Sequence, residues 1–426
     1  MTVERAPTNP GDASPLKIAL LGYRSNPYSG GQGIYLHYLS KALQAAGHSV
    51  DVISGPPYPD LVPGVRLIKL PSLDLYNEPN HVTALRPKHL TSLTDTFEYF
   101  SMLTGGFPEP YTFGRRLIKY FNEARPDYDI IHDNQSLCYG ALQLQRRGYP
   151  LVTTIHHPVT SDRELALASA TTARQRLLIR RWHAFIGMQK TVVKQLRHIV
   201  TVSEVSAHDV AEAFGLNQGR LNVIHNGIDT VTFSPRPDVQ RVPLRIMATA
   251  SADQPLKGLA YLLRAIAGLV PQYPDIHLVV VGKLKEDGAT NRLIDELGIR
   301  SRLRFVSGVE TEEIVRLYAE ASIVVVPSIY EGFGFPAGEA MACCVPVIST
   351  DGGALPEVVG EAGITVPVRD SQAIADNIAH LIENPEERSR LARAGRERIE
   401  ARFSWQVAAD KMIDFYRDVI NLETTA

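Results

Sequence analysis

The chain has 426 residues, with 44 Lys and Arg against 46 Asp and Glu, so its formal net charge is −2. At about 150 residues per domain, this length predicts two or three domains. The composition, 44% apolar and 21% charged, is that of a soluble globular protein and excludes a mostly disordered chain, a coiled coil and a disulfide scaffold. The near-zero charge argues against a general nucleic-acid binder, so we expect no nucleic-acid partner.

Neither a membrane span nor a secretion signal is visible in the sequence. The apolar runs are strand-sized, well short of the roughly 18 to 20 residues that cross a bilayer. Residues 1–15 contain three prolines and two acidic residues, so we expect a disordered lead-in rather than a signal peptide. Three cysteines are too few for a disulfide framework or a zinc site. These features predict a cytoplasmic protein.

The first ordered elements are a strand, a glycine-rich turn and a helix. Lys17–Gly22 is apolar, Ser29–Gly33 forms the turn, and apolar residues then recur at helical spacing as far as Ala46. This order opens a doubly wound α/β domain. Further strands are expected at Val50–Ile53, Val65–Leu70, Asp129–His132, Leu151–Ile155, Ile199–Val202 and Asn222–Ile224. Between about 72 and 112 the pattern weakens, and we expect a helical excursion with long loops.

A second alternating series follows a linker at Ser234–Asp238. Its expected strands are Leu244–Ala248, Ile276–Val281, Leu303–Val306, Ile323–Val326 and Val345–Ser349, with helices starting near Lys257, Ala289, Glu312 and Pro336. Two such series predict an α/β protein of two Rossmann-like domains facing across a cleft. We expect the domains over residues 16–232 and 240–402, with a C-terminal helix over 403–426 that crosses back to the first domain.

Two glycine-rich segments are candidates for binding phosphate. Gly30–Gly33 precedes a helix whose first N–H groups could meet an anion, although such a turn is often only a turn. The stronger candidate is Tyr330–Glu339, where Pro336 suits the first turn of a helix. Its two carboxylates, Glu331 and Glu339, could accept hydrogen bonds from the vicinal hydroxyls of a sugar and a ribose. This arrangement predicts a nucleotide diphosphate sugar as ligand, against the simpler reading of two surface glutamates beside a loop.

Several motifs together resemble the retaining nucleotide-sugar glycosyltransferases of glycosyltransferase family 4, which have the GT-B fold. They are Thr201–Ser203, His225–Asp229, Lys257–Gly258, Glu331 with Glu339, and Gly352–Gly353 with Glu357. The resemblance extends from Lys17 to about Ile420. It is looser between about 72 and 128, where such enzymes shape their acceptor sites.

The resemblance implies a role for each matching residue. Glu339 would hold the ribose and Glu331 the donor hexose. Lys257 would neutralise the diphosphate, and His156 would face the anomeric carbon. Substrate-binding positions would also include Gly31, Gly33, Asn226, Phe333, Gly334 and Phe335. The sequence departs from the family at Ser251, near which such enzymes commonly place an Arg, and Lys283 or Lys285 could replace that cation.

No metal ion or other cofactor is expected. Asp127–Asp129 has the Asp-x-Asp spacing of metal-dependent transferases with a different fold, and we interpret it as a chance match. Helix N-termini and Lys257 can supply the electrostatic stabilisation that a divalent ion would give.

Residues 174–198 contain seven Lys and Arg and no acidic residue. Treated as one helix, the segment places its cations on one side and apolar residues on the other. It could be a docked helix with a solvated basic face, or it could bind an anionic membrane surface at about 1 kcal/mol per cation.

The sequence therefore predicts a retaining hexosyltransferase that uses a nucleotide diphosphate sugar and an acceptor sugar or lipid. We expect it in the cytoplasm, with attachment to the inner face of the membrane as an alternative. The competing functions are a sugar-nucleotide epimerase of similar fold, a phosphorylase, and a catalytically weak sugar-nucleotide-binding scaffold.

Overall fold

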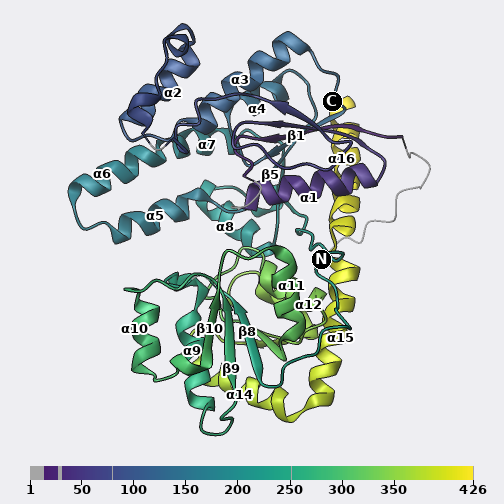
Figure 1. Ribbon diagram of the computed structural model, residues 1–426. Helices are drawn as coiled ribbons and strands as arrows, with labels where there is room; N and C mark the ends of the chain where they lie inside the picture. Colours follow the sequence, from purple (N-terminus) through teal and green to yellow (C-terminus); the bar gives the residue numbers. More distant parts are fainter. Residues whose placement is uncertain (1–13, 27–30, 79, 251, 426) are drawn as a thin grey trace. The chain divides into compact units, whose positions relative to one another are not determined.

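The computed structural model describes residues 14–26, 31–78, 80–250 and 252–425. Most of the expected lead-in, the first residues of the glycine turn (Ser29 and Gly30) and Ser251 lie outside the described residues. The chain forms two compact units (Figure 1). Unit 1 comprises Met1–Thr154, Val159–Ile199 and Met412–Ala426, and unit 2 comprises Ile155–Pro158 and Val200–Lys411.

A sheet with the order β3-β2-β1-β4-β5-β6-β7 organises unit 1. Its strands are β1 (Lys17–Gly22), β2 (Ser49–Ser54), β3 (Arg66–Lys69), β4 (Ile130–Asn134), β5 (Leu151–Ile155), β6 (His198–Thr201) and β7 (Leu221–Val223). The pairs from β3 through to β5 are parallel. Residues 18–21 of β1 are fully buried, as expected for a parallel strand covered on both faces. β6 crosses into unit 2, to which β7 belongs.

The helices of unit 1 follow β1, β3, β4 and β5. They are α1 (Gly31–Ala45), α2 (Leu93–Leu103), α3 (Glu109–Ala124), α4 (Tyr139–Arg146), α5 (Val159–Ser169), α6 (Ala173–Trp182) and α7 (Ile186–Val193). The weakly patterned region holds two 3₁₀ turns, η1 (His81–Ala84) and η2 (Pro87–Thr91), and then α2. Arg116 of α3 binds both Asp95 and Glu98 of α2 at 2.5 Å, which fixes α2 against α3.

The basic segment is not one docked helix, so the single-wheel prediction for residues 174–198 is wrong. A 3₁₀ turn at His183–Phe185 separates α6 from α7. α7 is docked through Ile186, Met188, Val192 and Val193, whereas α6 has no buried residue. The apolar residues expected to be buried are therefore exposed at α6, where Leu177 is 67% and Leu178 47% exposed.

Unit 2 contains a six-stranded sheet with the order β10-β9-β8-β11-β12-β13, and its pairs are parallel. The strands are β8 (Arg245–Thr249), β9 (His277–Val281), β10 (Leu303–Val306), β11 (Ile323–Val326), β12 (Val347–Thr350) and β13 (Ile364–Val366). The helices are α8 (Glu204–Phe214), α9 (Leu259–Leu269), α10 (Ala289–Glu296), α11 (Thr311–Glu320), α12 (Phe335–Ala342), α13 (Leu355–Val359), α14 (Ser371–Glu383) and α15 (Pro385–Arg402). Two parallel sheets with flanking helices confirm the predicted pair of Rossmann-like folds.

The last helix, α16 (Trp405–Thr424), belongs to unit 1 from Met412 onward. Its Tyr416 is fully buried, and the Tyr416 hydroxyl lies 2.5 Å from Nδ1 of His132 in β4. The other ring nitrogen of His132 lies 2.7 Å from Oγ1 of Thr154. Burial lowers the pKa of His132 to about 3, so this network holds a neutral imidazole.

The chain passes from unit 1 to unit 2 at Ile199/Val200, so the linker expected at Ser234–Asp238 lies within unit 2. The reason is that the segment after β6 makes its contacts with unit 2. For example, the N–H groups of Glu204 and Val205 donate to the carboxylate of Glu357.

No helix within the described residues is both long and apolar enough to cross a membrane.

Candidate active site

The strand order of unit 2 reverses between β8 and β11, and loops from these two strands meet there. Ligands in open α/β sheets bind at such a switch point, beyond the carboxyl ends of the strands. The loop after β8 docks on the loop after β11 by a backbone bond from Ile329 N–H to the carbonyl of Leu256, at 2.8 Å. Gly258 has φ +62°, and a Cβ there would overlap the carbonyl oxygen of Pro327. The two loops are therefore held together by backbone contact.

Lys257 and Glu331 form an ion pair at this switch point. Lys257 Nζ lies 2.8 Å from Glu331 Oε1, which also accepts a 2.8 Å hydrogen bond from Ser328 Oγ. The side chains of Lys257 and Glu331 are 30% and 12% exposed. Among the described residues, no partner is recorded for Glu331 Oε2. The pair can therefore present a cation and a carboxylate oxygen together.

A third loop, which follows β12, contacts the backbone of Glu331. The N–H of Ala354 donates to the carbonyl of Glu331 at 2.8 Å. Gly353 has φ +65°, and a Cβ at this position would overlap that same carbonyl oxygen. A Cβ at Gly352 would overlap the carbonyl of Ser328. Both glycines are required because the backbones of the two loops touch.

Glu331 and Glu339 lie on either side of the start of α12. Gly334 precedes the helix with φ +106°, and Pro336 occupies its first turn. Phe333 is buried, and its ring centroid lies 5.1 Å from that of Phe335. The first N–H groups of α12 have no partner within the helix and favour an anion.

Glu339 is held by a buried tyrosine. Tyr318 of α11 donates a 3.2 Å hydrogen bond to Glu339 Oε2, and the Tyr318 hydroxyl is also 3.1 Å from Oγ1 of Thr249. Burial raises the pKa of Glu339 to about 7, and the hydrogen bond from Tyr318 opposes that rise. Glu339 therefore changes charge near neutral pH.

His156, which directly follows β5, is linked by its backbone to the loop before α12. Ser206 Oγ lies 3.2 Å from both the carbonyl of His156 and the carbonyl of Gly332. Ser203 Oγ donates to the same Gly332 carbonyl at 2.8 Å. Ser206 was not among the predicted site residues, although it lies in the first turn of a helix that Ser203 caps.

Glu357 is a second residue that the predicted site omitted. Besides the two N–H groups at the start of α8, its carboxylate accepts from His225 Nε2 at 3.0 Å. Burial would raise the pKa of Glu357, but the hydrogen bonds from His225 and from the two N–H groups lower it below its usual value. Glu357 therefore anchors α8 beside the glycine loop.

Asn226 lies on the chain between β7 and the linker. Its side chain is buried, and Oδ1 has no hydrogen-bond partner among the described residues. The neighbouring Gly227 packs on the ring of Trp405, and Ile228 N–H donates to the carbonyl of Phe403 at 2.6 Å. This stretch therefore fixes the chain that leads into α16.

Gly31 and Gly33 lie in unit 1, at the β1/β4 switch point of its sheet. Asn134, at the end of β4, donates a 3.0 Å hydrogen bond to the carbonyl of Gln32. A Cβ at Gly33 would overlap the carbonyl of Asn26, whereas a Cβ at Gly31 would have no heavy atom of the described residues within 4 Å. Gly33 is thus required for packing, while Gly31 has no such requirement from the described part of the chain.

The remaining charged candidates have simpler surroundings. Lys283 and Lys285 are exposed. Asp127 pairs with Lys17 Nζ at 2.9 Å, and Asp129 accepts from the N–H of Lys17 at 2.7 Å. Among the described residues, no group of three or more His, Cys, Asp or Glu is placed to hold a metal ion.

Two Rossmann-like folds, with a lysine and two carboxylates around a helix N-terminus at one switch point, define the class of nucleotide-sugar glycosyltransferases with the GT-B fold. Sequence comparison gives the family. Residues 239–398 match the glycosyl transferases group 1 and residues 29–232 match glycosyltransferase family 4. The chain belongs to glycosyltransferase family 4.

Individual relatives agree with this assignment. The chain is 44% identical to the MMP α-(1→4)-mannosyltransferase of Mycolicibacterium hassiacum, over 95% of this chain and 98% of that protein. It is 30% identical to the D-inositol 3-phosphate glycosyltransferase of Saccharomonospora viridis, over 95% of each chain. Its fold matches sucrose-phosphate synthase from Thermosynechococcus elongatus with a TM-score of 0.68 and 26% identity, over 96% of this chain and 100% of that one. The protein is therefore a nucleotide-sugar glycosyltransferase, and the epimerase and scaffold alternatives are not favoured.

Proposed function

We propose that this enzyme transfers a mannosyl group from a nucleotide diphosphate mannose to a mannose-containing saccharide and forms an α-(1→4) linkage. The observation that carries this assignment is the 44% identity, over nearly the full length of both chains, to an MMP α-(1→4)-mannosyltransferase. The Lys257–Glu331 pair supports the proposal because it offers a cation and a carboxylate together, with Glu331 in the loop that precedes α12.

The leaving diphosphate gains negative charge as the glycosidic bond breaks. Lys257 has three N–H donors and uses one on Glu331, so the others can meet phosphate oxygens. The first N–H groups of α12 add positive potential at the same place. Such preorganised donors stabilise developing charge without rearranging during the reaction.

The two carboxylates would hold the two sugars of the donor. Glu331 can accept a hydroxyl of the transferred mannose through Oε2 while Oε1 stays on Lys257. Glu339 can accept the vicinal hydroxyls of the ribose once it is ionised. His156 would face the anomeric carbon, and Ser206 links its backbone to the loop that carries Glu331.

Retention and independence from metal ions are parts of the same proposal. A donor with an α-linked sugar gives an α-linked product only if configuration at the anomeric carbon is retained. Lys257 and the N-terminus of α12 can supply the positive charge that a divalent cation provides elsewhere. Activity should therefore persist in excess EDTA.

The test is a transfer assay with GDP-mannose, UDP-mannose, GDP-glucose and UDP-glucose as donors. Each donor is assayed in the presence and absence of α-(1→4)-linked mannooligosaccharides. We expect elongation by mannose only, with an α-anomeric proton in the NMR spectrum of the product, and Glu331→Gln as the inactive control. Transfer of glucose alone, or a β-linked product, would refute the assignment. Formation of a new nucleotide sugar in the absence of acceptor would instead support the alternative function of a sugar-nucleotide epimerase.

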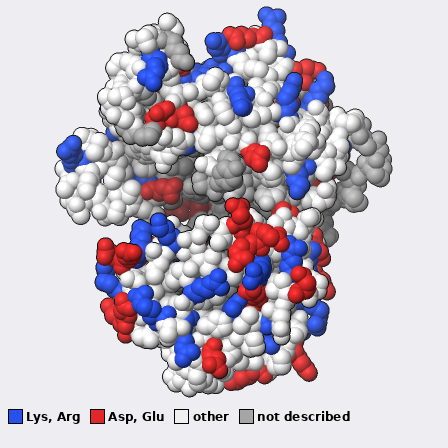
Figure 2. Space-filling view, in the orientation of Figure 1, with Lys and Arg blue, Asp and Glu red and all other residues white. Residues whose placement is uncertain are grey.

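A second proposal concerns α6, which we infer attaches the enzyme to an anionic lipid surface. Leu177 and Leu178 project from a helix that has no buried residue. Arg174, Arg176 and Arg180 are exposed on the same helix, and Figure 2 shows basic side chains, in blue, at the outer end of the lobe formed by α5 and α6. Trp182 does not add to this surface because it stacks on Phe107 with 5.1 Å between ring centroids.

Three exposed arginines at about 1 kcal/mol each give weak, salt-sensitive adhesion. Co-sedimentation with phosphatidylserine vesicles should therefore fall with rising salt and be lost in Leu177→Ser/Arg176→Ser. Lys194→Ser, a cation beyond the docked α7, serves as control. Equal, negligible binding to anionic and neutral vesicles would refute this attachment.

A further inference from the structure

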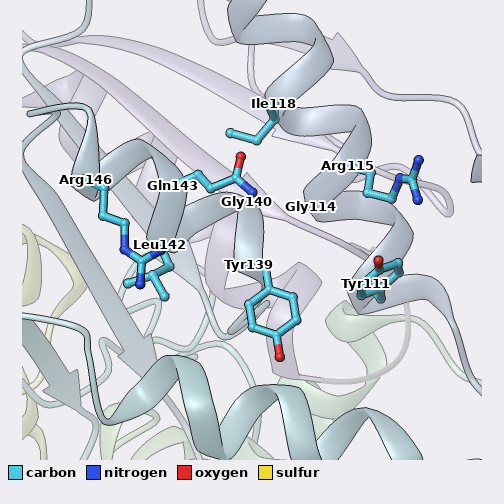
Figure 3. A pocket seen from close by; sticks show the side chains of 9 residues that line it. All are labelled: Tyr111, Gly114, Arg115, Ile118, Tyr139, Gly140, Leu142, Gln143 and Arg146. Atoms are coloured by element: carbon cyan, nitrogen blue, oxygen red, sulfur yellow. The ribbon is translucent and has the colours of Figure 1, made fainter.

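A groove lies between α3 and α4 in unit 1, apart from every residue assigned above. Its cavity measures about 340 Å³, which is within the range of small-ligand sites. Figure 3 shows side chains from both helices around it. The lining residues are Tyr111, Gly114, Arg115, Ile118, Tyr139, Gly140, Leu142, Gln143 and Arg146.

Two glycines form a rigid floor for this groove. A Cβ at Gly140 would overlap the carbonyl oxygen of Gly114, and a Cβ at Gly114 would lie 3.0 Å from both the N of Gly140 and the side chain of Cys138. The two helices therefore touch through their backbones, and the larger side chains stand on either side. A floor of this kind keeps its shape because neither helix can move toward the other.

A row of aromatic rings begins in the groove, where Tyr111 and Tyr139 belong to the lining, and ends beside it at Phe97. Phe97 of α2, Tyr111 of α3 and Tyr139 of α4 follow one another, with ring centroids 5.1 Å and then 6.3 Å apart. Phe97 and Tyr139 are 45% and 39% exposed. Aromatic rings bury much area with few rotatable bonds, and a tyrosine combines an apolar face with a polar tip.

Polar side chains complete the groove. Arg115 and Gln143 are exposed and have no recorded side-chain partner among the described residues. Arg146 is oriented by a 2.6 Å hydrogen bond from Nη2 to Gln195 Oε1, which leaves its other N–H groups available. The lining contains no Asp or Glu. The groove therefore presents guanidinium and amide donors beside flat apolar rings.

We propose that this groove binds one sugar unit of an oligosaccharide, with neighbouring units along the aromatic row. The ring of a hexose has apolar C–H faces that pack on aromatic rings, and hydroxyls at its edge that accept from guanidinium and amide groups. A small anion would not need the three rings, and an apolar peptide would leave the arginines and Gln143 unpaired. Successive rings lie 5.1 and 6.3 Å apart and are inclined to one another at 52° and 86°, so different rings can contact different sugar units.

This inference rests on the proposed function for the identity of the saccharide, an α-(1→4)-linked mannose chain. The groove would give that saccharide a second contact with the enzyme, in addition to the one at the reacting sugar. The test compares transfer to a mannose disaccharide and to an octasaccharide. In Tyr139→Ala and Arg115→Ala we expect at least a fivefold rise in KM for the octasaccharide, with kcat and the KM for the disaccharide unchanged. Lys119→Ala, an exposed cation one turn after Arg115 on α3, is the matched control.

Direct binding separates this inference from the proposed reaction. Calorimetric titration with the octasaccharide, without donor, should show at least fivefold weaker association for Tyr139→Ala than for the wild type. An array of neutral oligosaccharides gives the same comparison if the enzyme proves to use another sugar. Equal binding by both proteins, or no saccharide binding by the wild type on the array, would overturn the groove assignment. Failure of mannosyl transfer alone would overturn only the proposed function.

Discussion

Removing the charge from either end of the Lys257–Glu331 pair should slow transfer strongly, and removing both should cost little more than removing one. The variants Lys257→Met and Glu331→Gln keep side-chain length while each deletes one charge. Loss of a preorganised charge-stabilising group costs about 10²- to 10³-fold in kcat, which is about 2.7 to 4 kcal/mol. Each single variant should lose that much.

The 2.8 Å contact decides what the double variant does. If the two residues acted independently, the losses would multiply to about 10⁴- to 10⁶-fold. Because each orients the other at the switch point, we expect them to act as a unit, so that the double variant loses about 10³-fold. The expected coupling is then of the same order as a single loss, about 3 kcal/mol.

The assay is the initial rate of mannosyl transfer at saturating donor and acceptor for the wild type, both single variants and the double variant. Urea unfolding of all four proteins controls for misfolding. A double variant whose rate loss equals the product of the two single losses would refute the reasoning that Lys257 and Glu331 act as a unit. An unchanged rate in Lys257→Met would move the cationic role to Lys283 or Lys285.

Three further predictions follow from the described contacts. Because the pKa of Glu339 is about 7, donor affinity should fall by up to tenfold per pH unit below 7 and level off above pH 8. Calorimetric titration should show this pH dependence in the wild type and not in Glu339→Gln. A donor affinity that does not change with pH in the wild type would exclude the ribose role of Glu339. Tyr416→Phe leaves Nδ1 of buried His132 without its partner, so it should lower the free energy of unfolding by about 1 to 3 kcal/mol in urea, and an unchanged midpoint would contradict this account. Gly33→Ala should destabilise the protein, whereas Gly31→Ala should leave its melting temperature unchanged and raise the KM for the donor; equal melting curves for both variants would show that the overlap with Asn26 is not real.

Much of the fold could be predicted because buried parallel strands read as short continuous apolar runs. Residues 18–21 and 323–326 are such runs, and each lies in a central strand. The proximity of Lys257 and Glu331, 2.8 Å apart, could also be predicted in outline, since both residues follow strands that meet at a switch point. Here local sequence and global topology carry the same information.

The rest depended on contacts that sequence spacing does not reveal. Ser206 is 126 residues from Gly332, and Glu357 is 153 residues from Glu204, so neither partnership has a local pattern. The basic segment misled for a different reason. A helical wheel assumes a continuous helix with one face, but the 3₁₀ turn at His183–Phe185 changes the direction of the side chains between α6 and α7.

The two units position their side chains by different means. In unit 2, the loops that carry Lys257 and Glu331 touch through their backbones at Gly258 and Gly353. A Cβ at either glycine would overlap a carbonyl oxygen of the neighbouring loop. In unit 1, α2 is fixed to α3 by ion pairs from the side chain of Arg116 to Asp95 and Glu98. Side-chain contacts can be exchanged more easily than backbone packing. Under the proposed function, changes in acceptor preference should therefore arise through α2, α3 and α4, while the loops proposed to bind the donor should tolerate little change.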